Sequence, residues 1–185
     1  GAGDVDGDGY DDLLVGDPNY RSPNPAFPGK GRAMLFLGSA GGLSLAPDWS
    51  LESVDPIETL ASAIAGAGDV NADGFDDVLV SATYADTART GCVYAFLGSP
   101  QGLEQTASWR WCAIYGGSGN AIGDANADGF DDVSTYKGGS TYYGPGPVTY
   151  AFHGNAAGLR EIRLLSRHTG EPLSLIHISE PTRPY

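Results

Sequence analysis

One nine-residue acidic pattern occurs three times in this chain, and it constrains the fold more than any other feature of the sequence. The copies read Asp-Val-Asp-Gly-Asp-Gly-Tyr-Asp-Asp at 4–12, Asp-Val-Asn-Ala-Asp-Gly-Phe-Asp-Asp at 69–77 and Asp-Ala-Asn-Ala-Asp-Gly-Phe-Asp-Asp at 124–132. Each copy has oxygen-bearing side chains at positions 1, 3, 5 and 9 and a glycine at position 6. A Ca²⁺ ion takes about six to eight oxygen ligands, which a loop supplies when alternate side chains point inward around a glycine turn. The pattern therefore predicts three calcium-binding loops, with up to three bound ions.

The expected ligands are the side-chain oxygens at positions 1, 3, 5 and 9 and the main-chain carbonyl at position 7. They are Asp4, Asp6, Asp8, Tyr10 and Asp12 in the first loop, Asp69, Asn71, Asp73, Phe75 and Asp77 in the second, and Asp124, Asn126, Asp128, Phe130 and Asp132 in the third. The aromatic side chains at position 7 are then free to pack in a core. Because only the first loop has a carboxylate at position 3, its charge predicts the tightest calcium binding.

Two other interpretations of the loops are an EF-hand and a plain turn. An EF-hand requires a glutamate at position 12 and flanking helices, but position 12 is Val15, Val80 and Thr135 in the three copies. The runs 12–15 and 77–80 are β-prone and predict buried strands, whereas the third copy continues into a more polar strand. A metal-free Asp-Gly hairpin turn is the remaining alternative. Three copies with matched acidic positions favour metal binding.

The repeating unit is longer than the loop, since the loops begin 65 and 55 residues apart. A second β-prone run that ends in Phe-x-Gly follows each loop, at 33–38, 93–98 and 148–154. A leucine lies five residues beyond each of these glycines, at Leu43, Leu103 and Leu159. A period of this length is typical of stacked supersecondary units.

The loop, the Phe-x-Gly element and the preceding segments Gly-Ala-Gly-Asp-Val (1–5) and Ala-Gly-Ala-Gly-Asp-Val (65–70) together resemble the FG-GAP repeat of integrin α-subunit β-propellers and their bacterial relatives. Leu60-Ala61 and Tyr115-Gly116 stand where the family has Phe-Gly. The resemblance implies an all-β fold: a partial β-propeller of about three blades of four-stranded antiparallel sheet, with calcium-binding hairpin loops. The repeats would span about 1–60, 61–115 and 116–172.

We expect the chain to be a fragment, because a propeller needs about four to eight blades to close. The sequence begins in the middle of a repeat, and a fourth acidic loop is expected near 180–185. Residues 173–185 instead contain Leu-Ser-Leu-Ile-His-Ile-Ser, which resembles a translated sequencing adaptor, and we interpret them as a non-native tail.

Charge and cysteine content narrow the possible partners and the compartment. The net charge is −13, and the loops hold more than half of the acidic residues, which argues against a nucleic-acid partner. No apolar run is long enough to span a membrane. Calcium sites of moderate affinity fill outside the cell, so we expect an extracellular or cell-surface location. Cys92 and Cys112 would face each other across a hairpin centred on 99–103, either as a disulfide or as two buried thiols.

No catalytic motif occurs in the sequence, and the acidic clusters are all assigned to loops, so we predict that the chain is not an enzyme. His153 occupies the repeat position of Leu37 and Leu97, which favours a structural role. Trp109 and Trp111 share a strand face and favour packing between blades over ligand contact. The variable segments 18–28 and 137–147 are better candidates for recognition.

The predicted function is a calcium-binding propeller segment of a secreted or cell-surface protein that serves as a scaffold for binding a protein or glycan, as in cell adhesion. The alternative is an accessory propeller domain of an extracellular hydrolytic enzyme whose catalytic domain lies elsewhere.

Overall fold

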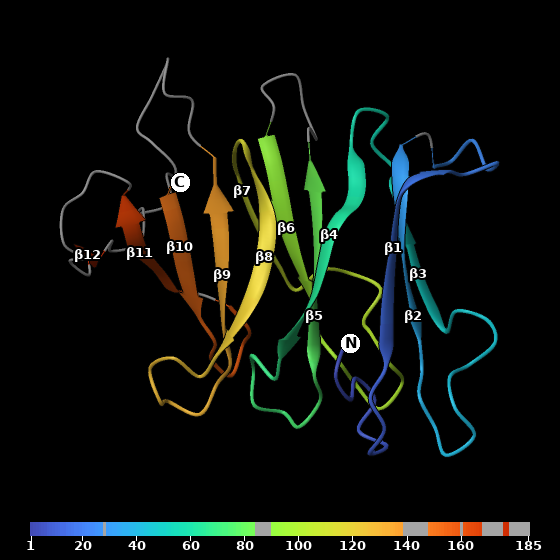
Figure 1. Cartoon of the computed structure of the whole chain (residues 1–185), viewed down its shortest axis with the longest axis horizontal. Coiled ribbons are helices and arrows are strands. Elements are labelled where there is room, and N and C mark those ends of the chain that lie inside the picture. The colour runs from blue at the N-terminus through green and yellow to red at the C-terminus, as the bar shows by residue number, and fades with distance from the viewer. Residues whose placement is uncertain (28, 84–89, 139–147, 160, 168–175, 178–185) are drawn as a thin grey trace.

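Strands account for all the regular structure in the part of the chain that the computed structural model describes, namely residues 1–27, 29–83, 90–138, 148–159, 161–167 and 176–177 (Figure 1). They are β1 (Leu13–Arg21), β2 (Lys30–Phe36), β3 (Trp49–Glu52), β4 (Thr59–Gly68), β5 (Asp77–Thr83), β6 (Thr90–Phe96), β7 (Trp109–Ile114), β8 (Gly116–Gly123), β9 (Asp132–Lys137), β10 (Val148–His153), β11 (Glu161–Arg167) and β12 (Ile176–His177). The predicted all-β class is confirmed. None of the described residues forms a helix long and apolar enough to cross a membrane.

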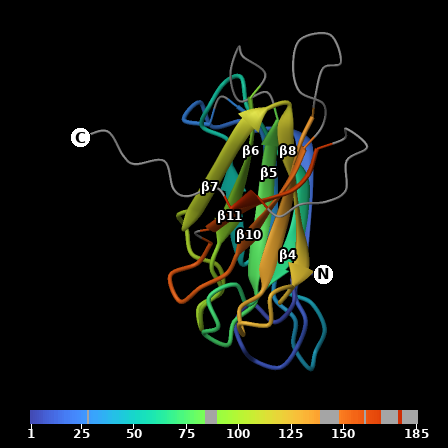
Figure 2. The same ribbon diagram turned by 90° about the vertical axis from the view of Figure 1, so that its left-hand side faces the viewer.

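The strands group into three antiparallel blades that lie side by side (Figures 1 and 2). The second blade is the antiparallel series β4-β5-β6-β7, and the third is β8-β9-β10-β11 with the short β12 at its edge. The first blade contains β1, β2 and β3. Its strand β2 forms one parallel residue pair with β4 of the second blade, Lys30 with Thr59. Stacked four-stranded antiparallel sheets are the building units of a β-propeller, as the sequence predicts.

Strand β5 shows how the blades are held together. Successive side chains of a strand point to opposite faces, and both faces of β5 are buried. Val78 and Val80 join a cluster with Leu14 and Leu35 of the first blade. Leu79, between them, joins a second cluster formed with the third blade. The middle blade is therefore packed on both sides, which explains its nearly continuous apolar run.

The same aromatic contact occurs at both junctions between blades. Trp49 of β3 packs edge-on against Phe96 with ring centroids 5.2 Å apart, and Trp109 of β7 packs likewise against Phe152 at 4.7 Å. Trp111 also contacts Phe152, at 5.7 Å. The expectation that Trp109 and Trp111 pack between blades is confirmed.

Cys92 and Cys112 are directly paired in the register of β6 and β7, and they form a disulfide. The hairpin geometry predicted this juxtaposition, and the structure selects the disulfide over two free thiols. The bond joins β6 to β7, the last strand of the second blade.

Two of the predicted segments lie partly outside the described residues. Of the recognition candidate 137–147, the structure describes only Lys137 and Gly138. Of the segment 173–185, it describes only β12, which pairs with β11. The other recognition candidate, 18–28, is described except for residue 28, and its first part belongs to β1.

Candidate metal-binding loops

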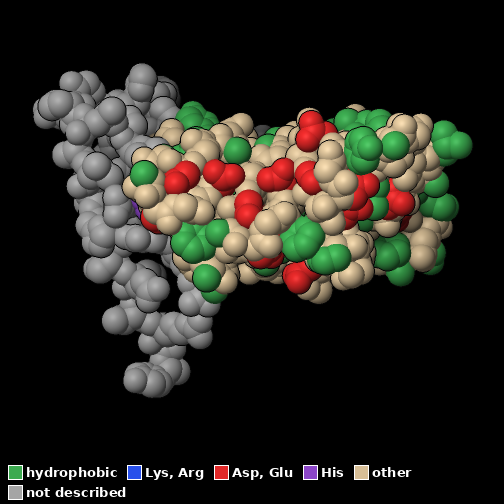
Figure 3. Space-filling model, turned by 90° about the horizontal axis from the view of Figure 1, so that it is seen from below, with side chains coloured by type: hydrophobic (Ala, Val, Ile, Leu, Met, Phe, Trp, Pro, Cys, Tyr) green, Lys and Arg blue, Asp and Glu red, His purple; other side chains and the backbone are tan. Residues whose placement is uncertain are grey.

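The three acidic loops lie at the same end of the molecule. The first precedes β1, the second joins β4 to β5, and the third joins β8 to β9. Acidic side chains gather along this end when the molecule is seen from below (Figure 3). The loops therefore occupy equivalent places in successive blades.

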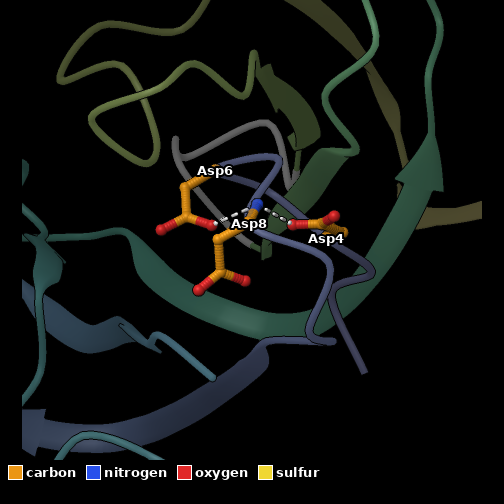
Figure 4. Close-up of side chains that lie close together, drawn as sticks. All are labelled: Asp4, Asp6 and Asp8. Carbon is orange, nitrogen blue, oxygen red and sulfur yellow. Dashed lines mark hydrogen bonds between the residues drawn. The ribbon is translucent and has the colours of Figure 1, made fainter. Parts of the chain in front are cut away.

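Asp4, Asp6 and Asp8 converge in the first loop, where one carboxylate oxygen from each lies within 4.8 Å of the others. The main-chain amide of Asp8 lies between the other two carboxylates, 3.0 Å from Asp4 Oδ1 and 3.2 Å from Asp6 Oδ1 (Figure 4). A close set of hard, anionic oxygens is the donor set that Ca²⁺ prefers.

Hydrogen bonds to the main chain shape all three loops in the same way. The carboxylate at position 1 accepts from the amides at positions 5 and 6, with distances of 3.0 and 2.9 Å in the first loop, 3.0 and 2.8 Å in the second, and 3.0 and 2.9 Å in the third. The glycines at position 6 have φ values of 91°, 94° and 92°, a left-handed conformation that disfavours other residues. The sequence thus folds each loop around its first aspartate.

The aspartates at position 9, Asp12, Asp77 and Asp132, are buried and hold each loop against its own blade. Asp77 Oδ2 accepts from the Val70 amide at 2.9 Å, and its Oδ1 accepts from the Gly98 amide at 2.8 Å. Asp12 and Asp132 make the equivalent pair of bonds in their own loops. The main-chain amide of the glycine in each Phe-x-Gly element thus donates a hydrogen bond to the position-9 aspartate of its loop. The sequence predicted position 9 only as a metal ligand.

Burial raises the pKa of two of these carboxylates, Asp77 and Asp12. Desolvation raises the pKa of Asp77 to about 7, a rise that the Gly98 and Val70 amides oppose and the nearby Asp73 and Asp69 reinforce. Desolvation likewise raises the pKa of Asp12. A divalent cation in the loop would favour the ionised forms, so the electrostatics of the loop fit a metal ion.

Position 8 has a role that the sequence pattern did not reveal, because its aspartates join neighbouring loops. Asp76 Oδ2 accepts from the Asp4 amide at 2.8 Å, while the Asp76 amide donates to the Asp4 carbonyl at 3.0 Å. Asp131 and Asp69 repeat the arrangement between the second and third loops, with both distances 3.0 Å. The only available signal was the presence of aspartate at position 8 in every copy.

The aromatic residues at position 7 differ from the expectation that they fill a core. Tyr10 is 45% exposed, so the expectation is wrong for this residue. Phe75 is half-buried and lies over Gly7 of the neighbouring loop, where an added Cβ would stand 2.7 Å from its ring. Phe130 is also half-buried. Phe75 therefore packs across loops and does not fill the core of its own blade.

Antiparallel blades that pack through repeated aromatic contacts, each with an acidic loop at the same end, define a propeller-type repeat protein. The family model of the FG-GAP repeat matches residues 1–33 and 61–96. The chain is accordingly an FG-GAP repeat protein of the integrin-α-like kind.

Several integrin α-subunits are similar to this chain. Human integrin alpha-IIb is 39% identical over 108 residues, which cover 57% of this chain and 10% of the integrin. Integrin alpha-PS2 of Drosophila melanogaster is 41% identical over 106 residues, covering 54% and 7%. Integrin alpha-5 of Xenopus laevis is 28% identical over 143 residues, covering 71% and 14%. The matched region is thus a small part of each relative.

Proposed function

We propose that this chain is a calcium-binding propeller segment of a secreted or cell-surface protein, and that it serves as a scaffold for adhesion to a protein or glycan. The observation that carries the proposal is the hydrogen-bond pattern that the three acidic loops share, within repeats similar to those of integrin α-subunits. The repeats would comprise about 1–60, 61–115 and 116–172. The disulfide between Cys92 and Cys112 supports an extracellular location.

The proposed ion acts as a structural staple. The side chains at positions 1, 3, 5 and 9 and the carbonyl at position 7 would hold it in each loop. Calcium supplies positive charge where carboxylates crowd together, and three ions would reduce the net charge from −13 to −7. Because the aspartate at position 9 also binds the Phe-x-Gly amide, order in the loop is coupled to order in the blade.

Partner recognition is proposed at the end of the molecule opposite the acidic loops, where the β1–β2 connection lies (Figure 1). A hollow of about 510 Å³ opens beside this connection and is lined in part by Tyr20, Phe27, Leu51 and Glu52. The guanidinium of Arg32 stacks over the Tyr20 ring at 3.9 Å, which fixes one wall. A variable loop beside a fixed hollow is a typical arrangement for a recognition site.

The calcium part of the proposal is tested by calorimetric titration of the chelated chain, together with its thermal unfolding. We expect calcium uptake and a higher melting temperature, with Asp8→Ala removing the tightest binding step. An unchanged melting temperature in saturating calcium would refute the proposed stabilising role of the ion. The adhesion part is tested on glycan arrays and immobilised extracellular-matrix proteins with wild type and a Phe27→Ala variant. Equal binding by the two proteins would exclude the β1–β2 end.

A further inference from the structure

The junction between the first and second blades differs from the next junction in the side chain that fills it. At both junctions the outer strand places a tryptophan against the phenylalanine of the next blade. Two residues further along, β7 has Trp111, which packs on Tyr150 with ring centroids 5.1 Å apart, whereas β3 has Leu51. Leucine is the smaller side chain, and a hollow of about 250 Å³ lies at the first junction, lined in part by Leu51 and by Tyr94, the equivalent of Tyr150.

The segment that joins the two blades adds a buried carboxylate to this hollow. The segment between Trp49 and the second acidic loop is five residues longer than that between Trp109 and the third. Within it, Ser53 and Glu58 line the hollow and are only 3% and 8% exposed. The rim is exposed, at Val54, Gln105 and Ala107. We call this hollow, with its buried base of Ser53, Glu58, Leu60 and Phe96, the Glu58 pocket.

Two hydroxyl groups hold the Glu58 carboxylate in place. The Ser53 hydroxyl donates to Oε2 at 2.7 Å, and the Tyr94 hydroxyl donates to Oε1 at 3.0 Å. Burial raises the pKa of Tyr94 to about 12, and the negative charge of Glu58 contributes to the rise, so Tyr94 stays a donor. A carboxylate has about four acceptor sites, so about two remain for a ligand.

The hydroxyl donors satisfy hydrogen bonds of the carboxylate but do not compensate its charge. Among the described residues, no lysine, arginine or histidine forms an ion pair with Glu58. The guanidinium of Arg110 lies 5.7 Å from the centre of the Tyr94 ring and is not within ion-pair distance of Glu58. A buried charge is costly unless an opposite charge compensates it. The pocket is therefore complementary to a cation carried on an apolar chain.

We propose that the Glu58 pocket binds the side chain of a lysine from a protein partner. The ammonium group pairs with Glu58, and its four-carbon stem lies against Leu51 and Phe96. A guanidinium fits less well, because its planar fork takes both oxygens of a carboxylate, and each oxygen of Glu58 already accepts a hydroxyl.

The Glu58 pocket adjoins the hollow beside the β1–β2 connection. The two share the lining residues Leu51, Glu52, Val54 and Gln105. The inference rests on the proposed adhesion function, since it names the chemistry of the partner at this end of the molecule.

The test uses the full chain in saturating calcium, so that added amine does not compete for the acidic loops. The probe is N-acetyl-lysine methylamide, followed by NMR chemical-shift titration, and the norleucine and arginine analogues are the control ligands. We expect the amide signals of Ser53 and Glu58 to shift and saturate with the lysine probe. The norleucine analogue, which lacks the ammonium group, should leave them unchanged, and the arginine analogue should bind more weakly than lysine.

Three variants locate the binding. Glu58→Gln should weaken binding of the lysine probe at least about tenfold, because it removes one partner of a buried charge pair. Leu51→Trp copies Trp111 and fills the pocket while keeping Glu58, and it should abolish binding. Glu104→Gln is the matched control, since it removes an exposed carboxylate outside the pocket and should bind as the wild type does. Thermal unfolding verifies that each variant is folded.

Several outcomes would overturn the inference. One is equal affinity of wild type and Glu58→Gln or, if that variant does not fold, of wild type and Leu51→Trp. Another is binding of the norleucine or arginine analogue as tight as that of lysine. Phe27 does not line the pocket, so Phe27→Ala should bind the lysine probe normally. Absent lysine binding with matrix binding that still depends on Phe27 would refute only the pocket. Lysine binding with matrix binding unaffected by Phe27→Ala would refute only recognition at the β1–β2 connection.

Discussion

The hydrogen bonds between neighbouring loops make the position-8 aspartates a sharp test of how the blades are joined. Asp76 receives the Asp4 amide at 2.8 Å, whereas the exposed Asp11, its equivalent in the first loop, makes no side-chain hydrogen bond within the described residues. Asp76→Ala and Asp11→Ala therefore remove the same charge from the same loop position. Only the first substitution removes a contact between blades.

The expected magnitude follows from the type of bond. A hydrogen bond to a charged acceptor contributes about 1.5–3 kcal/mol. Because Asp76 is half-buried, we expect the free energy of unfolding to fall by about 1–2 kcal/mol more in Asp76→Ala than in Asp11→Ala. For a chain of this size the difference corresponds to about 2–8 °C in melting temperature. Asp131→Ala should resemble Asp76→Ala, since Asp131 makes the same bond to Asp69.

Urea and thermal unfolding in chelator, monitored by tryptophan fluorescence, measure the effect. Trp49 and Trp109 both lie at blade junctions and report their separation. Asp76→Asn keeps an acceptor oxygen and should recover part of the loss. If Asp11→Ala costs as much as Asp76→Ala, the effect comes from charge or loop conformation, and the bridging role is wrong.

Three further predictions concern charge, glycine and the disulfide. Without metal, the free energy of unfolding should fall as pH rises from about 4 to about 7, because unfolded aspartate ionises near 3.8 while folded Asp77 keeps its proton to about 7. Urea titrations in chelator across this pH range measure the change. A free energy of unfolding that rose instead, with a profile that Asp77→Asn left unchanged, would contradict the reasoning. Gly68→Ala should lower the free energy of unfolding by at least about 1 kcal/mol more than Gly123→Ala does. Both glycines have positive φ, but only a Cβ added at position 68 would overlap the Asp131 carboxylate. Equal melting temperatures for the two variants would count against this prediction. The Cys92–Cys112 disulfide closes a separation of 20 residues, and its removal should lower the free energy of unfolding by about 3 kcal/mol by the chain-entropy relation. Urea unfolding of a variant with both cysteines replaced by alanine measures this loss. A loss below about 1 kcal/mol would show that constraint of the unfolded chain is not the main source of the stabilisation.

The sequence predicted what depends on local spacing. The alternation of oxygen side chains and the glycine at position 6 specified each loop, and the symmetry of 92 and 112 about a turn specified the cysteine pair. The pairing of Trp109 with the next blade followed from the shared face of alternate residues. These features require only a strand or a turn, whose geometry is known in advance.

Contacts between repeats could not be predicted in the same way, because they depend on how far one blade is displaced from the next. Asp76 and Asp4 are separated by 72 residues, and nothing in either loop indicates that they meet. Ala61 illustrates a related difficulty. It has φ 55°, a left-handed conformation that disfavours residues with a side chain, and nothing in the sequence pattern indicates that an alanine adopts it here. Ala61 is buried in the cluster that Val78 and Val80 form with Leu14 and Leu35.

The position-9 aspartates explain why loop and blade form one unit. Asp77 holds the Val70 amide of the loop with one oxygen and the Gly98 amide at the end of β6 with the other. A metal ion that favours the ionised form of Asp77 would strengthen both bonds, since a charged acceptor binds an amide more strongly than a neutral one. Metal binding in this loop would therefore be coupled to the pairing of β5 with β6 through a single carboxylate. An alanine at position 77 would separate the loop from its blade even if the remaining ligands still held an ion.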